Sequence, residues 1–325
     1  MSLSLSRLLP DKFTLALVGT VVLATLLPAQ GQVSEAFDGL TIGAIALLFF
    51  LHGAKLSREA ILAGALHWRL HLLIFSLTFL LFPALGLALK PVLAPLVTPE
   101  LYLGVLFMCA LPATVQSAIA FTSIARGNIP AAVCSASASS LLGIFITPFL
   151  VQLLLEVHGD TGSTLDAIQK IVLQLLVPFV VGHLARRWIG EWVDRNKAWL
   201  RYVDQMSILL VVYTAFGRAV LEGLWQAVPG SALLGLFVIC VVILALVLGI
   251  SVWLARLLGF NKEDEITIVF GGSKKSLATG VPMANVLFAA GTVGSVLLPI
   301  MIFHQLQLMV CVVIANRYAR RTGKT

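Results

Sequence analysis

Residues 270–282 read FGGSKKSLATGVP, and this stretch places two adjacent lysines and three glycines between the apolar runs ITIV (266–269) and MANVLFAA (283–290). At about 1.5 Å of helical rise per residue, Lys274 would lie about 12 Å beyond the start of a membrane helix at residue 266. A charge at that depth costs at least about 2.5 kcal/mol, so we expect it to face a cavity or a partner and not lipid. The stretch therefore predicts an interrupted membrane helix that carries a functional site.

The composition predicts that the whole chain belongs to a membrane. Hydrophobic residues make up 59% of the 325 residues, charged residues only 11%, and the mean hydropathy is +1.00. A soluble core of this size does not bury so much apolar surface, so we expect an all-α integral membrane protein. Ten apolar segments are long enough to cross about 30 Å of hydrocarbon as helices. They are residues 13–30, 38–54, 70–89, 101–125, 129–153, 167–188, 203–221, 231–255, 266–289 and 292–315.

The distribution of basic residues predicts the orientation. With both termini in the cytoplasm, 17 of the 22 lysines and arginines fall in inside segments. Lys90, Lys170 and Arg218 fall outside, and Lys274 and Lys275 lie within a helix. An excess of this kind is typical of cytoplasmic loops. The net charge of +7 then reflects topology and affinity for anionic lipid headgroups, and the pattern does not predict nucleic-acid binding.

The ten segments divide into two halves of five, and an odd number per half makes the second half inverted. The predicted repeats are residues 1–158 and 159–325 of a single polytopic domain. The fourth segment of the first half is interrupted by ALPATVQSA (110–118), where Pro112 removes a backbone donor. Its counterpart is the opening stretch, in which three glycines and Pro282 interrupt the helix. Paired interruptions of this kind predict a binding site near the middle of the membrane, where the two segments cross.

The stretch GGSKKSLATGVPMA (271–284) closely resembles a signature of the bile acid:sodium symporter superfamily, in the branch of solute carrier family 10 member 7 and its bacterial relatives. The resemblance extends over residues 10–317. It implies ten helices in two inverted repeats, grouped in a panel (helices one, two, six and seven) and a core, with helices four and nine unwound where they cross. It also implies secondary transport of an organic anion across a cell membrane, which for the bacterial relatives is the inner membrane. Transport is coupled to sodium in the better-understood branches.

The sequence departs from the sodium-coupled members of this family, which present a glutamate and a glutamine to the cation from the broken part of helix nine. Here residues 271–276 contain no carboxylate. Oxygen-bearing side chains of helices four and five could still coordinate sodium, namely Gln116, Ser117, Ser135 and Ser139. Two ammonium groups nearby would repel that cation.

Three interpretations of the two lysines are open. One ammonium can replace the sodium ion as a tethered cation, which either removes the need for a coupling ion or couples transport to a proton through its own deprotonation. The lysines can instead attract an anionic substrate, together with backbone amides that the glycines expose. In the third interpretation, at least one lysine only reaches the cytoplasmic interface or forms a structural pair.

The candidate binding residues come from the two interruptions and from the helix that follows each. They are Thr114, Gln116, Ser117, Ser135, Ser139, Gly272, Ser273, Lys274, Lys275, Ser276, Thr279, His304 and Gln305. His304, Gln305 and also Gln307 could line the same cavity, but hydrogen bonding between helices is an equally good interpretation for all three. The serines of helix five can equally be small packing residues.

Other functions find little support in the sequence. The HExxH and GxSxG motifs are absent, and the spacing around GSKKS does not fit a phosphate-binding loop, so no enzyme activity is predicted. The four cysteines lie in apolar segments without metal-ligand spacing. A small anionic solute and the lipid bilayer are the predicted partners, with no protein partner or cofactor implied. A channel or a non-transporting regulator of ion homeostasis is the alternative, but paired broken helices favour alternating access.

Overall fold

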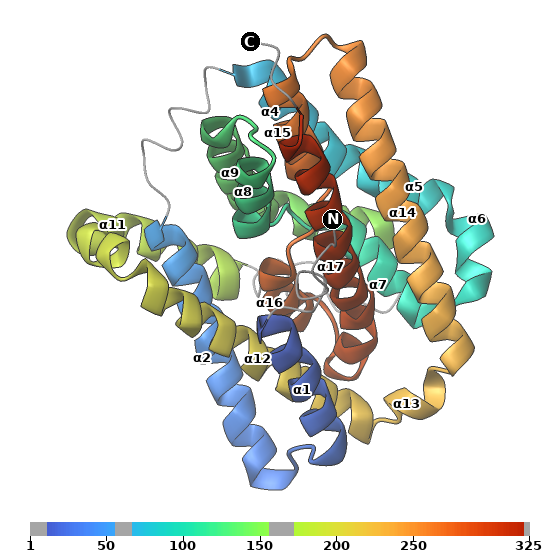
Figure 1. Ribbon diagram of the computed structural model, residues 1–325. Coiled ribbons are helices and arrows are strands. Elements are labelled where there is room, and N and C mark those ends of the chain that lie inside the picture. The colour runs from blue at the N-terminus through green and yellow to red at the C-terminus, as the bar shows by residue number, and fades with distance from the viewer. Residues whose placement is uncertain (1–11, 56–66, 156–171, 322–325) are drawn as a thin grey trace. The chain divides into compact units, whose positions relative to one another are not determined.

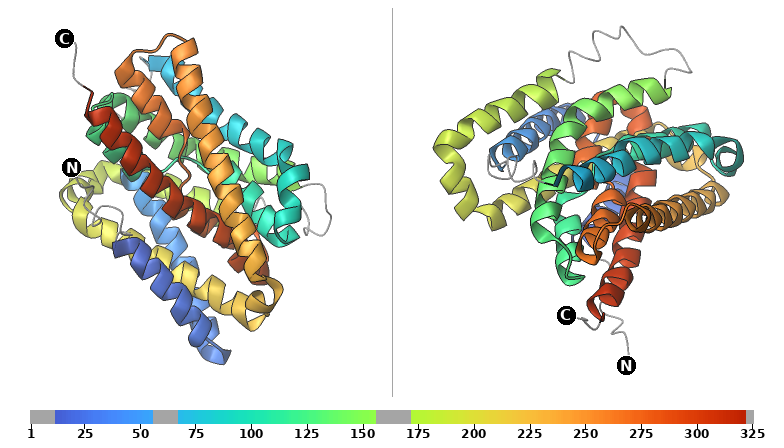
Figure 2. Two further views of the ribbon diagram at one scale, coloured as in Figure 1. Left: turned by 45° about the vertical axis from the view of Figure 1, so that its right-hand side comes forward. Right: turned by 90° about the horizontal axis from the view of Figure 1, so that it is seen from above.

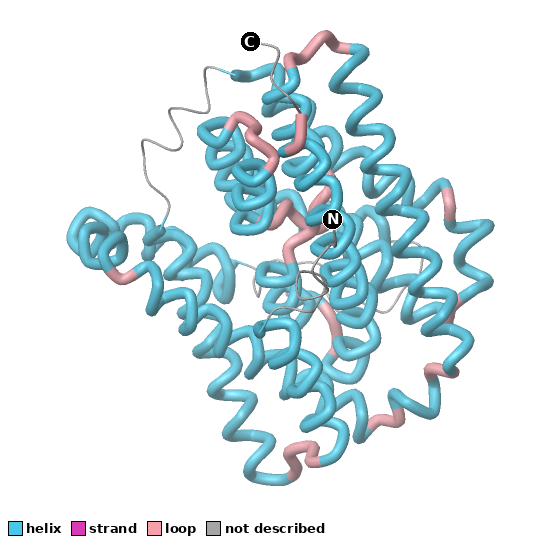
Figure 3. The backbone as a smooth tube through the Cα atoms, viewed as in Figure 1, coloured by secondary structure: helices cyan, strands magenta, loops and turns pink. Residues whose placement is uncertain are grey.

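The computed structural model describes residues 12–55, 67–155 and 172–321, and nearly all of them are helical (Figures 1 and 3). No strand occurs in these three stretches. The chain divides into two compact units, which we describe separately. Unit 1 comprises Met1–Lys55, Gly162–Val228 and Val281–Leu297, and unit 2 comprises Leu56–Thr161, Pro229–Gly280 and Leu298–Thr325. Several elements of the predicted topology lie outside the described residues: both chain ends, the repeat boundary, the start of the sixth segment, and Arg7, Arg58, Lys170 and Lys324.

Unit 1 contains the helices that correspond to predicted segments one, two, six and seven, as expected for the panel, and in addition residues 281–297. Its helices are α1 (Lys12–Leu26), α2 (Gly31–Lys55), the π-helical turn η5 (Val172–Leu176), α11 (Val177–Arg195), α12 (Lys197–Leu221) and α13 (Leu224–Ala227). Helix α2 packs along α11, and α12 packs against α1 and α2 (Figure 1). A Cβ atom at Gly53 would lie 2.0 Å from the Phe179 carbonyl oxygen, and one at Gly182 would lie 1.9 Å from that of Phe50. The backbones of α2 and α11 therefore approach more closely than a side chain at either glycine would allow.

Unit 2 contains the interrupted helices. Its elements are α4 (Trp68–Ser76), the π-helical turn η3 (Leu77–Leu81), α5 (Phe82–Ala88), α6 (Lys90–Leu93), η4 (Ala94–Leu96), α7 (Pro99–Ala110), α8 (Val115–Ile124), α9 (Ile129–Leu155), α14 (Gly230–Leu257) and α15 (Lys262–Gly272). Helix α16 (Leu277–Leu287) begins in this unit, and α17 (Ala290–Ala319) ends in it. Helix α15 packs against α4, α8, α9 and α14, and Figure 2 shows α14 and α15 side by side. Leu70, Ile74, Leu77, Ala255 and Ile268 are buried together where α4, η3, α14 and α15 meet.

The helices of the described residues are those of a multi-pass membrane protein. By length and composition, seven of them can each cross a membrane, and the number becomes eight when the bent pair α7 and α8 counts as one span. Helix α1 has only 15 residues, and α15 and α16 have 11 each, so the ten predicted crossings are not all matched by long helices. Large apolar side chains such as Leu15, Val18 and Leu234 are exposed, as expected of helices that face lipid.

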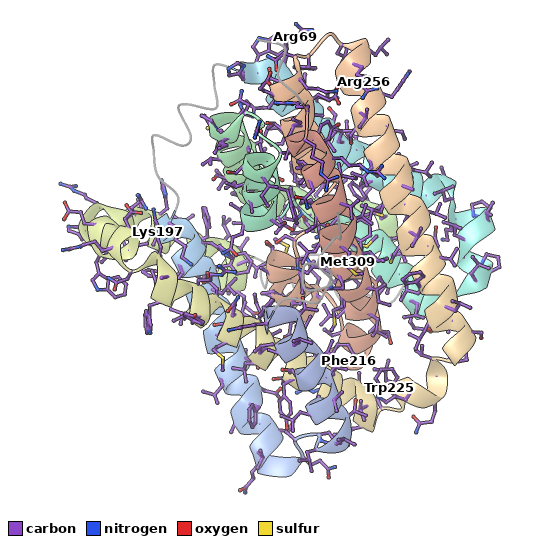
Figure 4. The ribbon with its side chains drawn as sticks, in the orientation of Figure 1. Arg69, Lys197, Phe216, Trp225, Arg256 and Met309 are labelled. Atoms are coloured by element: carbon purple, nitrogen blue, oxygen red, sulfur yellow. The ribbon has the colours of Figure 1, made fainter. Side chains whose placement is uncertain are left out.

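Hydrogen bonds hold the N-terminal turn of α15 in unit 2. The buried carboxylate of Glu265 accepts hydrogen bonds from Lys262 (2.7 Å) and Arg256 (3.2 Å), and the Tyr318 hydroxyl adds a third at 2.7 Å. Burial opposes the charged form, but these hydrogen bonds outweigh it, so the pKa of Glu265 lies below its ordinary value. The cluster of Glu265, Lys262, Arg256 and Tyr318 therefore joins α14, α15 and α17. Figure 4 shows that Arg69 lies at the same end of unit 2 as Arg256.

Candidate functional site

Two interrupted helices form the candidate site in unit 2. Residues 111–114 separate α7 from α8, with a bend of 63° between the two helices, and residues 273–276 separate α15 from α16. We call these two non-helical segments together the crossing. The structure confirms both predicted interruptions. It differs in the position of the residues that were expected to break the helix: Gly271 and Gly272 end α15, and Gly280 and Pro282 lie within α16, so none of the four lies in the gap.

The two halves of the crossing contact each other directly. The Ser276 backbone N–H donates a hydrogen bond to the Pro112 carbonyl oxygen, at 2.9 Å. The Thr114 hydroxyl donates to the Lys275 carbonyl oxygen, at 2.7 Å. Backbone groups that no longer belong to a helix must find other partners when they are buried, and these bonds supply some of them. The two interruptions therefore stabilise each other, because each provides hydrogen-bond partners for polar groups of the other.

The Lys275 side chain is fully buried and fully hydrogen-bonded. Its Nζ donates to three main-chain carbonyl oxygens, those of Thr78 (2.8 Å), Cys109 (2.8 Å) and Leu111 (2.7 Å). We call these three oxygens the carbonyl cradle. An ammonium group has three donors, so the cradle uses all of them. The Phe82 ring covers the same ammonium with its centroid 4.1 Å away, which adds a cation–π contact.

The cradle exists because helix α7 ends inside the protein. Its last carbonyls have no partner within the helix, and the C-terminal end of a helix carries partial negative charge. Lys275 binds the Cys109 and Leu111 oxygens, and the Thr147 hydroxyl binds the Ala110 oxygen between them at 2.8 Å. Thr78 contributes from η3, a π-helical turn of the type that often occurs at functional sites.

Gln307 of α17 holds the backbone of the crossing. Its Oε1 accepts from the Lys275 N–H (2.9 Å), and its Nε2 donates to the Lys275 carbonyl oxygen (3.0 Å). The ring of His304 lies 3.0 Å from the same Nε2. Gln307 is fully buried, and these hydrogen bonds to another segment agree with interhelical hydrogen bonding, one of the two interpretations open for it. Its partner was not predictable, because the Lys275 peptide unit is a main-chain group that leaves no mark in the sequence.

The Lys274 side chain is also fully buried, but its surroundings are different. Its Nζ lies 4.3 Å from the ring centroid of Phe121 and 5.7 Å from that of Phe270. The Cys311 thiol interacts with it electrostatically. Among the residues that the structure describes, no atom accepts a hydrogen bond from this Nζ in normal geometry. Aromatic faces replace only part of the hydration that a buried ammonium loses, so Lys274 is the poorly satisfied cation of the pair.

The four oxygens predicted as sodium ligands lie in different environments. Ser135 is hydrogen-bonded to a histidine of α4 at 2.6 Å, and Ser139 accepts from the Ala113 backbone N–H at 3.0 Å. Gln116 is exposed. The Ser117 hydroxyl is buried and has no hydrogen-bond partner within the described part of the chain. Ser139 is the member of this set that binds the crossing itself.

The remaining candidate residues have local roles or no assigned partner. Ser276 and Thr279 form the first turn of α16, where their hydroxyl oxygens lie 2.8 Å apart and the Thr279 N–H donates to Ser276 Oγ at 3.2 Å. A Cβ atom at Gly272 would lie 2.5 Å from the Leu77 side chain of η3, so a larger residue here would require that leucine to shift. The Ser273 hydroxyl and the Gln305 side-chain oxygen are buried without a hydrogen-bond partner among the described residues.

The cradle does not fit a sodium ion as it stands. Hard cations prefer oxygen ligands with negative charge nearby. The three cradle oxygens are already bound to the Lys275 ammonium, and within the described residues no carboxylate is hydrogen-bonded to the crossing. The nearby acid Glu265 is instead bonded to Lys262, Arg256 and Tyr318.

A membrane protein with two interrupted helices that meet around buried charge has the architecture of a secondary transporter. Comparison with known proteins agrees. The model of the SBF-like CPA transporter family matches residues 11–320. The chain therefore belongs to this family, within the branch of the bile acid:sodium symporter superfamily that the helix-nine motif indicates, and it is a multi-pass membrane transporter.

Three relatives illustrate the range of the family. The chain is 70% identical to an uncharacterized protein of Pseudomonas aeruginosa over 319 residues, which are 98% of this chain and 96% of that protein. It is 60% identical over 315 residues to an Escherichia coli protein named "Putative symporter YfeH", covering 96% of this chain and 94% of the relative. It is 30% identical over 269 residues to the mouse sodium/bile acid cotransporter 7, covering 82% and 79% of the two chains.

Proposed function

We propose that the protein is a secondary active transporter that moves an anionic solute by alternating access, with Lys275 in the place of a coupling cation. The observation that supports this proposal is the carbonyl cradle, in which three main-chain oxygens surround one ammonium group. Oxygen cages of this kind suit a small monovalent cation, and here the cation is part of the chain. The charge that a coupling ion would bring is then present permanently.

The electrostatics of the crossing favour an anionic solute. Lys274 and Lys275 are both fully buried, and within the described residues no carboxylate is hydrogen-bonded to either ammonium. Two positive charges in a low-dielectric environment attract strongly an anion that reaches them. Lys275 is occupied by the cradle, so Lys274 is the cation available to a solute.

The proposed architecture has ten crossing segments in two inverted five-helix repeats, residues 1–158 and 159–325. The paired interruptions of α7–α8 and α15–α16, each in the fourth place of its half, support this arrangement. An inverted pair of this type provides two related conformations, which is the basis of alternating access. The proposed location is the bacterial inner membrane, with both termini in the cytoplasm.

Uptake into proteoliposomes tests the proposal. A panel of radiolabelled carboxylates and sulfonates would be offered to the purified protein with no gradient, a sodium gradient or a pH gradient. We expect saturable uptake of at least one anion, independent of sodium and lost in the Lys274→Ala, Lys275→Ala double variant. Unimpaired uptake by the double variant would remove the assignment of the crossing as the site, and a substrate-independent ion conductance would indicate a channel.

A further inference from the structure

Unit 1 contains a cavity of about 210 Å³ that the proposed function does not use. Its polar lining comes from three elements of that unit: Asp38 and Thr41 on α2, Thr214 and Arg218 on α12, and Asn285 on α16. Pockets for drug-sized ligands are typically about 300–1,000 Å³, so this cavity suits a smaller solute.

An ion pair lines the cavity. The Arg218 guanidinium donates a hydrogen bond to the Asp38 carboxylate, and their side chains remain 36% and 35% exposed. The other ion pair that joins α2 to α12, Lys55 with Asp204, is more deeply buried at 24% and 13%. Both α2 and α12 are long and apolar enough to cross a membrane, and a charged residue inside such a span is a functional candidate by default.

The hydrogen-bonding groups of the lining favour an anion. The Thr214 hydroxyl donates to the Leu210 carbonyl oxygen at 2.8 Å, so in the 2.8 Å contact between Thr41 and Thr214 the donor is Thr41. Both hydroxyl protons are therefore in use. The donors that remain in the polar lining are the other N–H groups of Arg218 and the carboxamide of Asn285. A guanidinium binds carboxylates through two parallel hydrogen bonds, which makes a carboxylate its preferred partner.

We infer that this cavity binds a small carboxylate, and that Arg218 recognises it by exchanging the carboxylate of Asp38 for that of the solute. Asp38 then acts as an internal competitor that neutralises Arg218 when no solute is bound. The inference rests on the proposed transport of an anionic solute and supplies that function with a docking residue in unit 1. It also accounts for Arg218 as one of the few basic residues predicted on the outer side.

Thermal unfolding of the full chain in detergent tests the inference, with formate, acetate, lactate and succinate as probes and succinamide as the uncharged control. We expect at least one carboxylate to raise the unfolding temperature, and succinamide to leave it unchanged. Asp38→Asn removes the competitor, so its half-maximal carboxylate concentration should fall about tenfold or more, since hydrogen bonds to charged groups are individually strong. Arg218→Gln should abolish the response.

Two controls separate recognition from a structural role. Asp204→Asn breaks the Lys55 pair of the same unit, which does not line the cavity, and its carboxylate response should equal that of the unaltered chain. If Arg218→Gln fails to fold, the Asp38→Asn, Arg218→Gln double variant replaces the pair by two uncharged amides of similar size and should unfold normally but show no response. The inference is overturned if no carboxylate stabilises the protein, if Asp38→Asn binds no more tightly, or if the double variant still responds. Sodium-independent uptake that needs Lys274 and Lys275 would leave the proposed function standing in each of these cases.

Discussion

Lys274 and Lys275 are adjacent and both fully buried, yet their ammonium groups have opposite surroundings. Lys275 donates to three carbonyl oxygens, whereas Lys274 lies over two phenylalanine rings beside the Cys311 thiol and makes no hydrogen bond of normal geometry within the described residues. The unwound backbone makes this possible, because it lets neighbouring side chains point to unrelated partners. In the proposed mechanism the two lysines therefore have separate roles, one as a fixed cation of the crossing and one as the cation available to a solute.

This difference predicts opposite effects of the same substitution. Lys275→Met should lower the free energy of unfolding by about 3 kcal/mol, because three buried carbonyl oxygens lose their donor. Lys274→Met should leave it unchanged or raise it, since replacing a poorly satisfied buried charge by an apolar side chain is often stabilising. Equilibrium unfolding in mixed micelles measures both variants side by side. An equal loss of unfolding free energy in the two variants would contradict the assignment of different surroundings to the two ammonium groups.

Gln307 provides a second prediction for a single residue. Gln307→Leu removes both hydrogen bonds to the Lys275 peptide unit and should destabilise the protein by about 1–3 kcal/mol. Gln305→Leu, two residues away on the same helix, is the matched control and should have a smaller effect, because its side-chain oxygen has no partner among the described residues. The unfolding free energies of the two variants give the comparison, and the reverse order would show that Gln307 does not hold the crossing.

At the scale of elements, the sequence predicted the interruptions because proline and glycine act on the backbone locally. Pro112 lies in the first gap, and Gly272 is the last residue of the helix before the second. The contacts between the gaps were not predictable, since the cradle consists of main-chain oxygens that every residue carries. The Asp38–Arg218 pair was missed for another reason: the two residues are 180 positions apart and no local pattern links them.

The close packing of α2 and α11 predicts a sensitive glycine. Gly182→Ala would bring a methyl group to 1.9 Å from the Phe50 carbonyl oxygen, so the helices must separate. We expect a loss of at least about 1–3 kcal/mol in unfolding free energy. Gly39→Ala on α2 is the control, because no atom lies within 4 Å of its added Cβ and alanine is the better helix former. A tolerated Gly182→Ala together with a disruptive Gly39→Ala would contradict this packing.

The cluster around Glu265 predicts a pH dependence of stability. A carboxyl group whose pKa is lowered by folding stabilises the protein above the pKa of the unfolded chain, about 4.3, and that contribution is lost as the pH falls through the folded value. The difference in unfolding temperature between the unaltered chain and Glu265→Gln should therefore be large at pH 7 and shrink below about pH 4. Glu35→Gln, at an exposed position of α2, should show no such difference. A difference in unfolding temperature that stays constant from pH 7 to pH 3.5 would contradict the stabilising role of the Glu265 carboxylate.

At the scale of the whole molecule, the composition predicted the membrane class and the motif in residues 271–284 predicted the family, and the match to the family over residues 11–320 confirms the second prediction. In the proposed mechanism, this chain differs from the sodium-coupled members of the family in the identity of the cation at the crossing. A transporter with a tethered cation keeps the fold and the interrupted helices of its family but has no need of a sodium gradient. The central claim is thus that Lys275 has taken the place of the ion.

The most direct test is a titration of the unfolding temperature with sodium chloride against choline chloride, performed on the unaltered chain, Lys275→Ala and Lys274→Ala. Removing the Lys275 side chain empties the carbonyl cradle, so this variant should be stabilised more by sodium than by choline. The unaltered chain and Lys274→Ala should show no preference. A sodium-specific stabilisation of the unaltered chain, or no cation preference in Lys275→Ala, would contradict the claim.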